Sequence, residues 1–200
     1  MNPHFIFNAI NSVQYFMTSN DPESSQKYLS KFAKLIRYVM DNSKPSSIPL
    51  EKELDALKLY IDLEALRFEN RFEYVLQVDK QIDVNYIQIP SMLIQPYVEN
   101  AIWHGLMHKK GDGKLSIHIK MHDSFLTCII EDNGIGRERS KEIRSSESLT
   151  YHKSFGMSVT KERLEIISRL NNINPRINVI DLYENGLATG TRVEISIPSF

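Results

Sequence analysis

The sequence contains a single cysteine, Cys128, so no disulfide can form within one chain. This residue lies in the apolar run LTCIIED, which is typical of a buried and unreactive strand position. The lack of internal disulfides is typical of proteins from a reducing, intracellular compartment. We therefore expect Cys128 to have a packing role.

The sequence also lacks long apolar runs and an excess of one charge. No run approaches the roughly 20 residues of a membrane span, and no signal peptide precedes the first motif. The formal net charge of −1 argues against direct nucleic-acid binding, which usually requires a basic surface. Because the chain begins inside an expected helix, we expect a longer membrane-anchored parent protein, with these residues on the cytoplasmic face.

The first 45 residues predict a helical hairpin. Pro3 suits the first turn of a helix, and apolar residues recur with helical spacing from there to Met17. Asp21 is a candidate cap for a second amphipathic helix. Such a hairpin has little core of its own, so we expect it to pair with a second copy in a homodimer.

Residues 46–200 predict an α/β domain, which makes the fold class α+β. The segment NSKPSSIP reads as a linker, and the polar segment Arg137–Ser154 reads as a mobile loop. We expect helices over residues 50–68, 91–106 and 156–170, and strands over residues 72–78, 114–121, 126–131, 176–183 and 191–197.

Two motifs in this domain carry acidic and amide side chains. Asn100 offers an amide oxygen that suits Mg²⁺ held together with substrate phosphates, and Glu99 offers a carboxylate. A solvated helix face is the alternative interpretation. Asp132 begins the motif DNGIG directly after an expected strand, where a carboxylate can accept a hydrogen bond from an exocyclic amine. Gly134 and Gly136 let the backbone approach a ligand, although a simple glycine turn explains them equally well.

Two further motifs contain glycine. Gly156 in SFGM lies at an expected helix start, where backbone N–H groups can bind phosphate, although a helix start needs no ligand. Thr191 closes the motif TGT before the last expected strand, which by itself suggests a hairpin turn. The order of the four motifs is more specific than any one of them.

This order resembles the asparagine box and the three glycine boxes of the GHKL ATP-binding fold. The segments NPHFIFN, LEKELDALKLYIDLEALRF and IPSMLIQPYVENAIWHG are similar to those of the LytS/YehU-type sensor histidine kinases. The resemblance covers essentially the whole chain. It implies a helical hairpin followed by an α/β sandwich of the GHKL type, with ATP as substrate and Mg²⁺ as cofactor.

The resemblance implies that His4 accepts the γ-phosphoryl group of ATP. On a helix His4 shares a polar face with Asn8, and a neutral imidazole has a free nitrogen lone pair at pH 7. Asn8 would orient a water molecule for dephosphorylation of a partner. Glu99 is the candidate general base, because the acidic residue that often follows the phosphorylated histidine is Phe5 here.

The resemblance also assigns the nucleotide site. Asp132 would bind the adenine amine, Asn100 would hold Mg²⁺, and Arg137–Ser154 would form an ATP lid. Gly134 and Gly136 would shape the pocket, and Gly156 would form the hinge and anion site at the end of the lid. Thr191 would line the adenine end of the pocket. The basic residue common two places after the alanine of the asparagine box is replaced by tryptophan, so the candidates for neutralising phosphate are His104, Lys109, Lys110, Arg137 and Lys153.

Two more departures from the family pattern are Ser154, in place of a glycine, and Val159, in place of an asparagine. The leading hypothesis is a histidine kinase that passes its phosphoryl group to a response regulator of the LytTR DNA-binding type. A nucleotide-binding pseudokinase that signals by conformation is the alternative. A GHKL enzyme that phosphorylates serine is a third possibility, although it would not need NPHFIFN.

Overall fold

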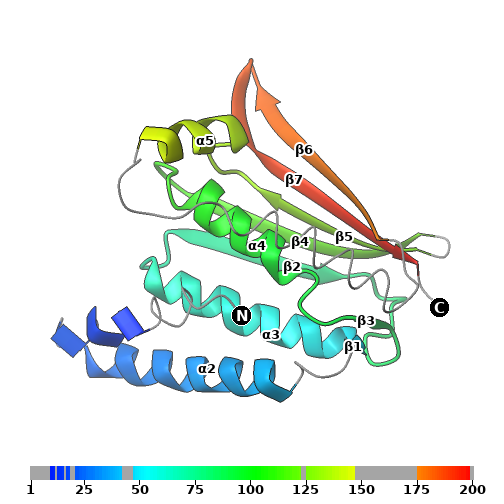
Figure 1. Ribbon diagram of the computed structural model, residues 1–200, viewed down its shortest axis with the longest axis horizontal. Helices are drawn as coiled ribbons and strands as arrows, with labels where there is room; N and C mark the ends of the chain where they lie inside the picture. Colours follow the sequence, from blue (N-terminus) through cyan, green and yellow to red (C-terminus); the bar gives the residue numbers. More distant parts are fainter. Residues whose placement is uncertain are drawn as a thin grey trace.

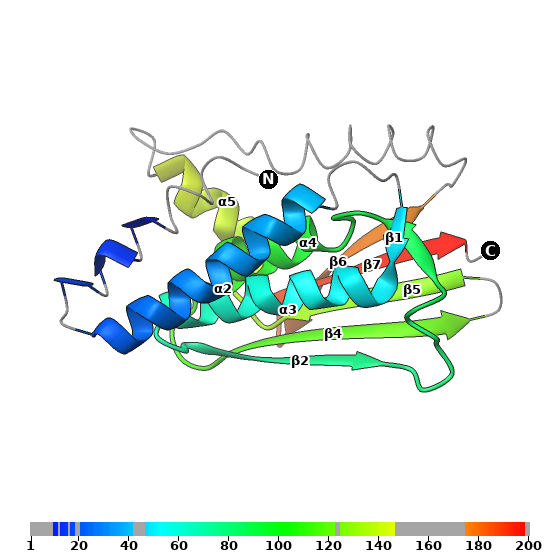
Figure 2. The ribbon, with the colours of Figure 1, turned by 90° about the horizontal axis from the view of Figure 1, so that it is seen from below.

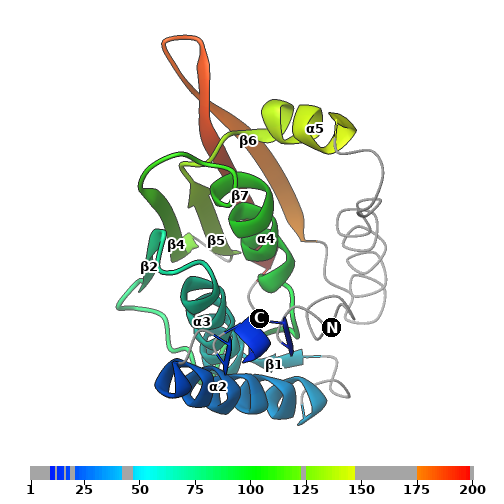
Figure 3. The same ribbon diagram turned by 90° about the vertical axis from the view of Figure 1, so that its left-hand side faces the viewer.

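The computed structural model describes residues 10–11, 13–15, 17–18, 21–41, 47–122, 125–146 and 175–198. A five-stranded sheet is covered on one face by helices, so the structure is a two-layer α/β sandwich (Figure 1). Figure 3 shows the helix layer and the sheet from the side. Within the described residues, no helix has the length and apolar character needed to cross a membrane.

Two long helices run alongside each other at the N-terminal side (Figure 2). Helix α2 (Pro22–Asp41) begins where Ser24 N–H donates to the Asp21 carboxylate over 3.0 Å, as the sequence predicts. It packs against α3 (Leu50–Arg67), and both helices contribute to one hydrophobic core. The predicted helix over residues 50–68 is thereby confirmed.

The main sheet has the strand order β2-β4-β5-β7-β6. Strands β2 and β4 are parallel, and every other neighbouring pair is antiparallel. The strands are β2 (Phe72–Val78), β4 (Gly113–His122), β5 (Phe125–Asp132), β6 (Arg176–Glu184) and β7 (Leu187–Pro198). The five strands predicted from the sequence are all present, with bounds within a few residues of those expected.

Strand β5 shows why these segments form half-buried strands. Leu126, Cys128 and Ile130 alternate toward the helices and are buried, whereas the residues between them lie on the other face. Cys128 is 1% exposed, and burial raises the pKa of its thiol. The predicted packing role of Cys128 is confirmed.

The remaining elements are short. They are β1 (Ser47–Pro49), β3 (Gln88–Pro90), α4 (Gln95–Asn100), the π-helix η1 (Ala101–Leu106) and α5 (Arg137–Ser146). Strands β1 and β3 pair in an antiparallel two-stranded sheet. The end of the predicted linker therefore forms a strand, because it finds a partner about forty residues later in the chain.

The helix predicted to begin near Ser91 begins at Gln95 instead. The buried Glu53 carboxylate causes this difference, because it accepts the N–H groups of Met92 and Ile94 over 2.8 and 3.2 Å. Met92 has φ +58°, a conformation that no α-helix contains. Glu53 therefore holds a turn where the local sequence pattern is helical.

The prediction of a loop over Arg137–Ser154 is wrong for residues 137–146, which form α5. Arg137 makes a bidentate ion pair with Asp181 of β6, and Ser140 N–H donates to the Gly136 carbonyl at 3.2 Å. Ser140 is buried. These polar contacts hold a helix that has no apolar periodicity, and residues 147–154 lie outside the described part of the chain.

The interpretation of the TGT motif as a hairpin turn is also wrong. Gly190 lies inside β7, and the turn between β6 and β7 is formed by Asn185 and Gly186 with φ +52° and +78°. Two consecutive positive φ angles are typical of the tight turns that match strand twist. The TGT residues are therefore free to contact the end of β5.

Candidate functional site

Asp132 is the buried acidic residue around which the candidate site is built. It is the last residue of β5, is 4% exposed, and accepts the N–H of Gly134 over 2.8 Å. Burial raises the pKa of Asp132 to about 6, although hydrogen bonds from the backbone of Gly134 and Thr191 oppose this shift. The carboxyl therefore changes its charge within one or two pH units of neutrality.

Three glycines bring the backbone unusually close to Asp132 and to each other. A Cβ atom on Gly105 would lie 2.6 Å from Asp132 Oδ1, and one on Gly190 would lie 1.9 Å from the Asp132 carbonyl oxygen. A Cβ atom on Gly134 would lie 2.3 Å from the carbonyl carbon of Gly105. Only glycine fits at these three positions, because each neighbour is backbone or a buried carboxylate.

The π-helix η1 produces the contact made by Gly105. Met107 N–H donates to the Ile102 carbonyl over 2.9 Å, five residues back, instead of four as in an α-helix. Ile135 N–H donates to the Gly105 carbonyl over 3.1 Å. Short π-helices occur frequently at functional sites. Here the wider turn presents backbone to the DNGIG segment.

Asn133 fixes the turn that follows Asp132. Its side-chain oxygen accepts Lys114 N–H over 2.7 Å, and its own N–H donates to the Lys114 carbonyl over 3.1 Å. The Lys109 ammonium donates to the Asn133 carbonyl over 2.6 Å. Lys109, a candidate for neutralising phosphate, is therefore used to hold this turn.

The predicted asparagine box lies at the junction of α4 and η1. Glu99 and Asn100 are half-buried, so the alternative of a fully solvated helix face is not observed. Burial raises the pKa of Glu99. In the described ranges, no three His, Cys, Asp or Glu side chains gather as a metal site. The amide oxygen of Asn100 and the carboxylate of Glu99 are oxygen donors of the type that divalent cations accept in proteins.

The other predicted site residues are spread over η1, β7 and the N-terminal end of α5. Gly136, with φ +76°, precedes α5, and Thr191 pairs with Asp132 across β5 and β7. His104 is half-buried on η1. Arg137 is bound to Asp181 through both guanidinium ends at 2.6 Å. The predicted residues outside the described part of the chain are His4, Asn8, Lys153 and Gly156.

A charged cluster between α3 and α4 has no signal in the sequence patterns. Glu64 is 1% exposed, and its Oε2 lies 3.7 Å from Arg67 NH1. The Arg67 guanidinium lies 4.4 Å from the centre of the Trp103 ring. Burial and the charge of Glu99 raise the pKa of Glu64 to about 7, whereas Arg67 opposes the shift. Two carboxyls and one guanidinium therefore interact beside the asparagine box.

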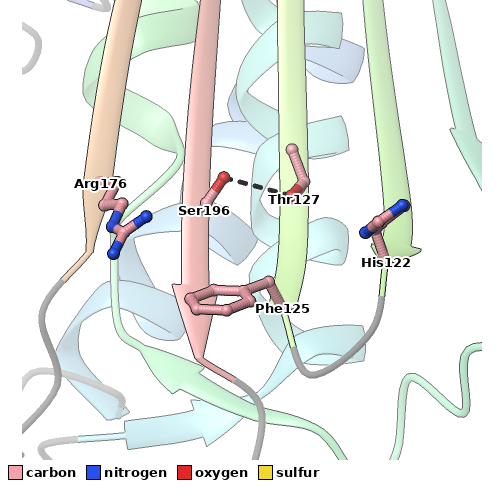
Figure 4. Close-up of a pocket in the computed structure, with 5 residues that line it drawn as sticks. All are labelled: His122, Phe125, Thr127, Arg176 and Ser196. Carbon is pink, nitrogen blue, oxygen red and sulfur yellow. Dashed lines mark hydrogen bonds between the residues drawn. The ribbon is translucent and has the colours of Figure 1, made fainter.

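A hollow on the other face of the sheet does not belong to this site. Figure 4 shows its lining at the opposite end of β5 from Asp132, with the helices behind the strands. The lining consists of His122, Phe125, Thr127, Arg176 and Ser196, and the hydroxyls of Thr127 and Ser196 lie 3.2 Å apart.

Comparisons with known proteins indicate the family of this chain. The model of a family described as "Histidine kinase" matches residues 1–72. Sensor histidine kinase YpdA of Escherichia coli is 32% identical over 136 residues, covering 68% of this chain and 23% of that protein. Sensor protein LytS of Staphylococcus haemolyticus is 31% identical over 206 residues, covering 100% of this chain and 33% of that protein. The chain thus spans a third or less of these two relatives.

The fold matches that of a solved histidine kinase. The structure of histidine kinase ThkA in complex with response regulator protein TrrA superposes with a TM-score of 0.51 at 14% identity. The match covers 98% of this chain and 59% of that one. At this identity the likeness concerns the fold, which is an α/β sandwich of the GHKL type, as the sequence predicts.

We expect Gly105→Ala to destabilise the protein by about 1–3 kcal/mol, because the new methyl group would overlap the Asp132 carboxylate. The free energy of unfolding from denaturant titration measures this cost. A double-mutant cycle with Asp132→Ala provides the control, since the cost should shrink when the carboxylate is absent. Strictly additive costs would contradict the proposed contact.

Proposed function

This chain belongs to the LytS/YehU-type sensor histidine kinases, and we propose that it binds ATP and transfers the γ-phosphoryl group to His4. The phosphoryl group then passes to an aspartate of a response regulator. The observation that carries this proposal is the buried Asp132 carboxylate, held among three glycines at the end of β5.

Asp132 is suited to recognising adenine. Its Oδ1 accepts Gly134 N–H, and a carboxylate has about four lone-pair sites, so it can accept a further hydrogen bond from an exocyclic amine. In a buried setting an unmatched polar group is costly, so such a bond discriminates strongly between bases. Gly134, Gly136 and Thr191 would shape the adenine end of the pocket.

Asn100 and Glu99 are suited to binding the phosphate end of the nucleotide. Asn100 would supply an amide oxygen to Mg²⁺, which when bound neutralises phosphate charge. His104 follows on η1 and would face the phosphates. Residues 137–154 would form the lid, with α5 as its first part, and Gly156 would form the hinge and anion site at its end.

His4 would act as the nucleophile. A lone pair of the neutral imidazole forms the N–P bond while the bond from the γ-phosphorus to the ADP oxygen breaks, and the imidazolium loses its N–H proton. Glu99 is the proposed acceptor of that proton. Its pKa is raised by burial, which makes its carboxylate a better base than an exposed one.

The partner of the phosphorylated chain would be a response regulator of the LytTR DNA-binding type, with no direct nucleic-acid contact by this chain. Asn8, four residues after His4, would orient water for dephosphorylation.

We propose a helical hairpin in residues 1–45, a GHKL domain in residues 46–200, and a full-length protein anchored in the plasma membrane with this part on its cytoplasmic face.

The hairpin would form a homodimer through α2. Tyr28 and Leu35 are buried, whereas a second apolar stripe with helical spacing faces away from them and is partly or fully exposed. This stripe consists of Leu29, Ala33, Ile36 and Met40. An apolar seam with this spacing is typical of helices that pair in a bundle.

The kinase activity is tested with γ-labelled ATP and Mg²⁺. We expect an acid-labile, base-stable phosphoramidate in the parent chain and none in His4→Gln. Tight ATP binding without label would favour the pseudokinase, and a longer chain would then be tested. Label that persists in His4→Gln would rule out this histidine.

We expect ATP affinity to fall as the pH drops through about 6, because protonation removes the acceptor on Asp132. Its folded pKa is raised, so the neutral carboxyl is favoured in the folded state and the charged acceptor predominates only above that pH. The dissociation constant should rise about tenfold from pH 7.5 to pH 5. Calorimetric titration at each pH measures it.

Asp132→Asn is the matched control for this pH dependence. At pH 7.5 it should weaken ATP binding by about 10- to 100-fold, which corresponds to the loss of a hydrogen bond to a charged acceptor. Its remaining affinity should change little with pH beyond the titration of ATP itself. The same pH profile in both proteins would show that another group controls binding.

Replacement of Leu29 and Met40 by glutamate should shift the protein from dimer to monomer, because charge in an apolar seam is costly. Light scattering and sedimentation measure the mass in solution. Lys34→Glu, at an exposed polar position of the same helix, should leave the mass unchanged. A dimer that persists in the double variant would place the interface elsewhere.

A further inference from the structure

Arg67 comes from the last turn of α3 and contacts the helix that carries the asparagine box. Its guanidinium lies 4.4 Å from the Trp103 ring centre and 5.4 Å from that of Phe68, and these two rings meet edge to face at 5.5 Å. Trp103 follows Asn100 by three residues. Three residues lie within a single helical turn, so Trp103 is close to Asn100 along the chain of this helix.

Part of the donor capacity of the guanidinium is unused within the residues that the structure describes. Its NH1 is buried and has no hydrogen-bond partner among the described residues, because Glu64 Oε2 lies 3.7 Å away. The Arg67 side chain is 21% exposed, so it also reaches the surface. A buried cation with an unmatched donor is costly unless an anion completes it.

Two of the cations that the sequence suggests for phosphate already have other partners. Lys109 is bound to the Asn133 carbonyl, and both ends of Arg137 are bound to Asp181. The place two residues after Ala101 is occupied by Trp103, which has no charge. Trp103 instead provides the flat surface on which a cation from another helix rests.

We propose that Arg67 is a further binding residue of this site, and that its guanidinium contacts the γ-phosphate of ATP. A guanidinium on an aromatic ring presents a planar set of donors to a phosphate, which forms stronger hydrogen bonds than a neutral acceptor. The stacking on Trp103 orders the side chain before the phosphate arrives. This inference rests on the proposed function.

Nucleotide selectivity tests the inference without requiring phosphotransfer. The dissociation constants of Mg·ATP and Mg·ADP are measured calorimetrically on the 200-residue chain and on Arg67→Gln. We expect ATP to bind at least about tenfold more weakly to the variant, whereas ADP binding changes less than about twofold. Arg71→Gln, an exposed arginine just beyond the same helix, should alter neither constant.

Two further variants separate binding from a structural role. Arg67→Lys keeps the charge but loses the planar donors, and it should bind ATP with intermediate affinity. Trp103→Leu removes the stacking surface and should also weaken ATP more than ADP. Should Arg67→Gln fail to fold, the same comparison is made on these two variants.

The possible results are distinct. Equal losses for ATP and ADP, or no loss for either, in folded Arg67 variants would overturn the role of Arg67 alone. A parent chain that binds neither nucleotide would overturn the proposed function and this inference with it. An ATP-specific loss in the Arg67 and Trp103 variants would support both.

Discussion

The structure depends on one constraint, which is the contact of three backbone segments around a single buried carboxylate. Asp132 is the last residue of β5, Gly190 lies beside it in β7, and Gly105 of η1 approaches its carboxylate closely. No side chain separates these segments, so their spacing fixes how the helix layer sits on the sheet. The energetic cost of burying the carboxyl is visible in its raised pKa. A charge kept at such a cost is typical of binding sites.

Helix α3 connects helix α2 with the site around Asp132. On one side it shares a core with α2, and the ion pair between Lys31 and Asp62 joins the two helices. On the other side it carries Glu64 and Arg67 to the asparagine box, and Glu53 at its beginning sets where α4 starts. A displacement of α2 would therefore be transmitted to the candidate site through α3, which contacts both.

Sequence patterns predicted those parts of the fold that have a local cause. Alternation of apolar residues located all five strands of the main sheet, and the motif order singled out Asp132, which the structure buries at the end of β5. The failures have distant causes. The start of α4 is set by Glu53, about forty residues earlier, and α5 is held by Asp181, which follows it by more than thirty residues. Gly105 was visible as an isolated glycine in a helical pattern, but Arg67 beside Trp103 had no local signal.

The π-helix η1 has a consequence for the evolution of the chain. A π-helix accommodates one more residue than the α-helical turn it replaces. Deletion of one residue between Asn100 and Gly105 would restore ordinary helical hydrogen bonding, but it would rotate the glycine away from Asp132 and place a larger side chain against Gly134. The length of this segment and the glycine at position 105 therefore constrain each other, because removing the extra residue would also remove the close contact that requires glycine.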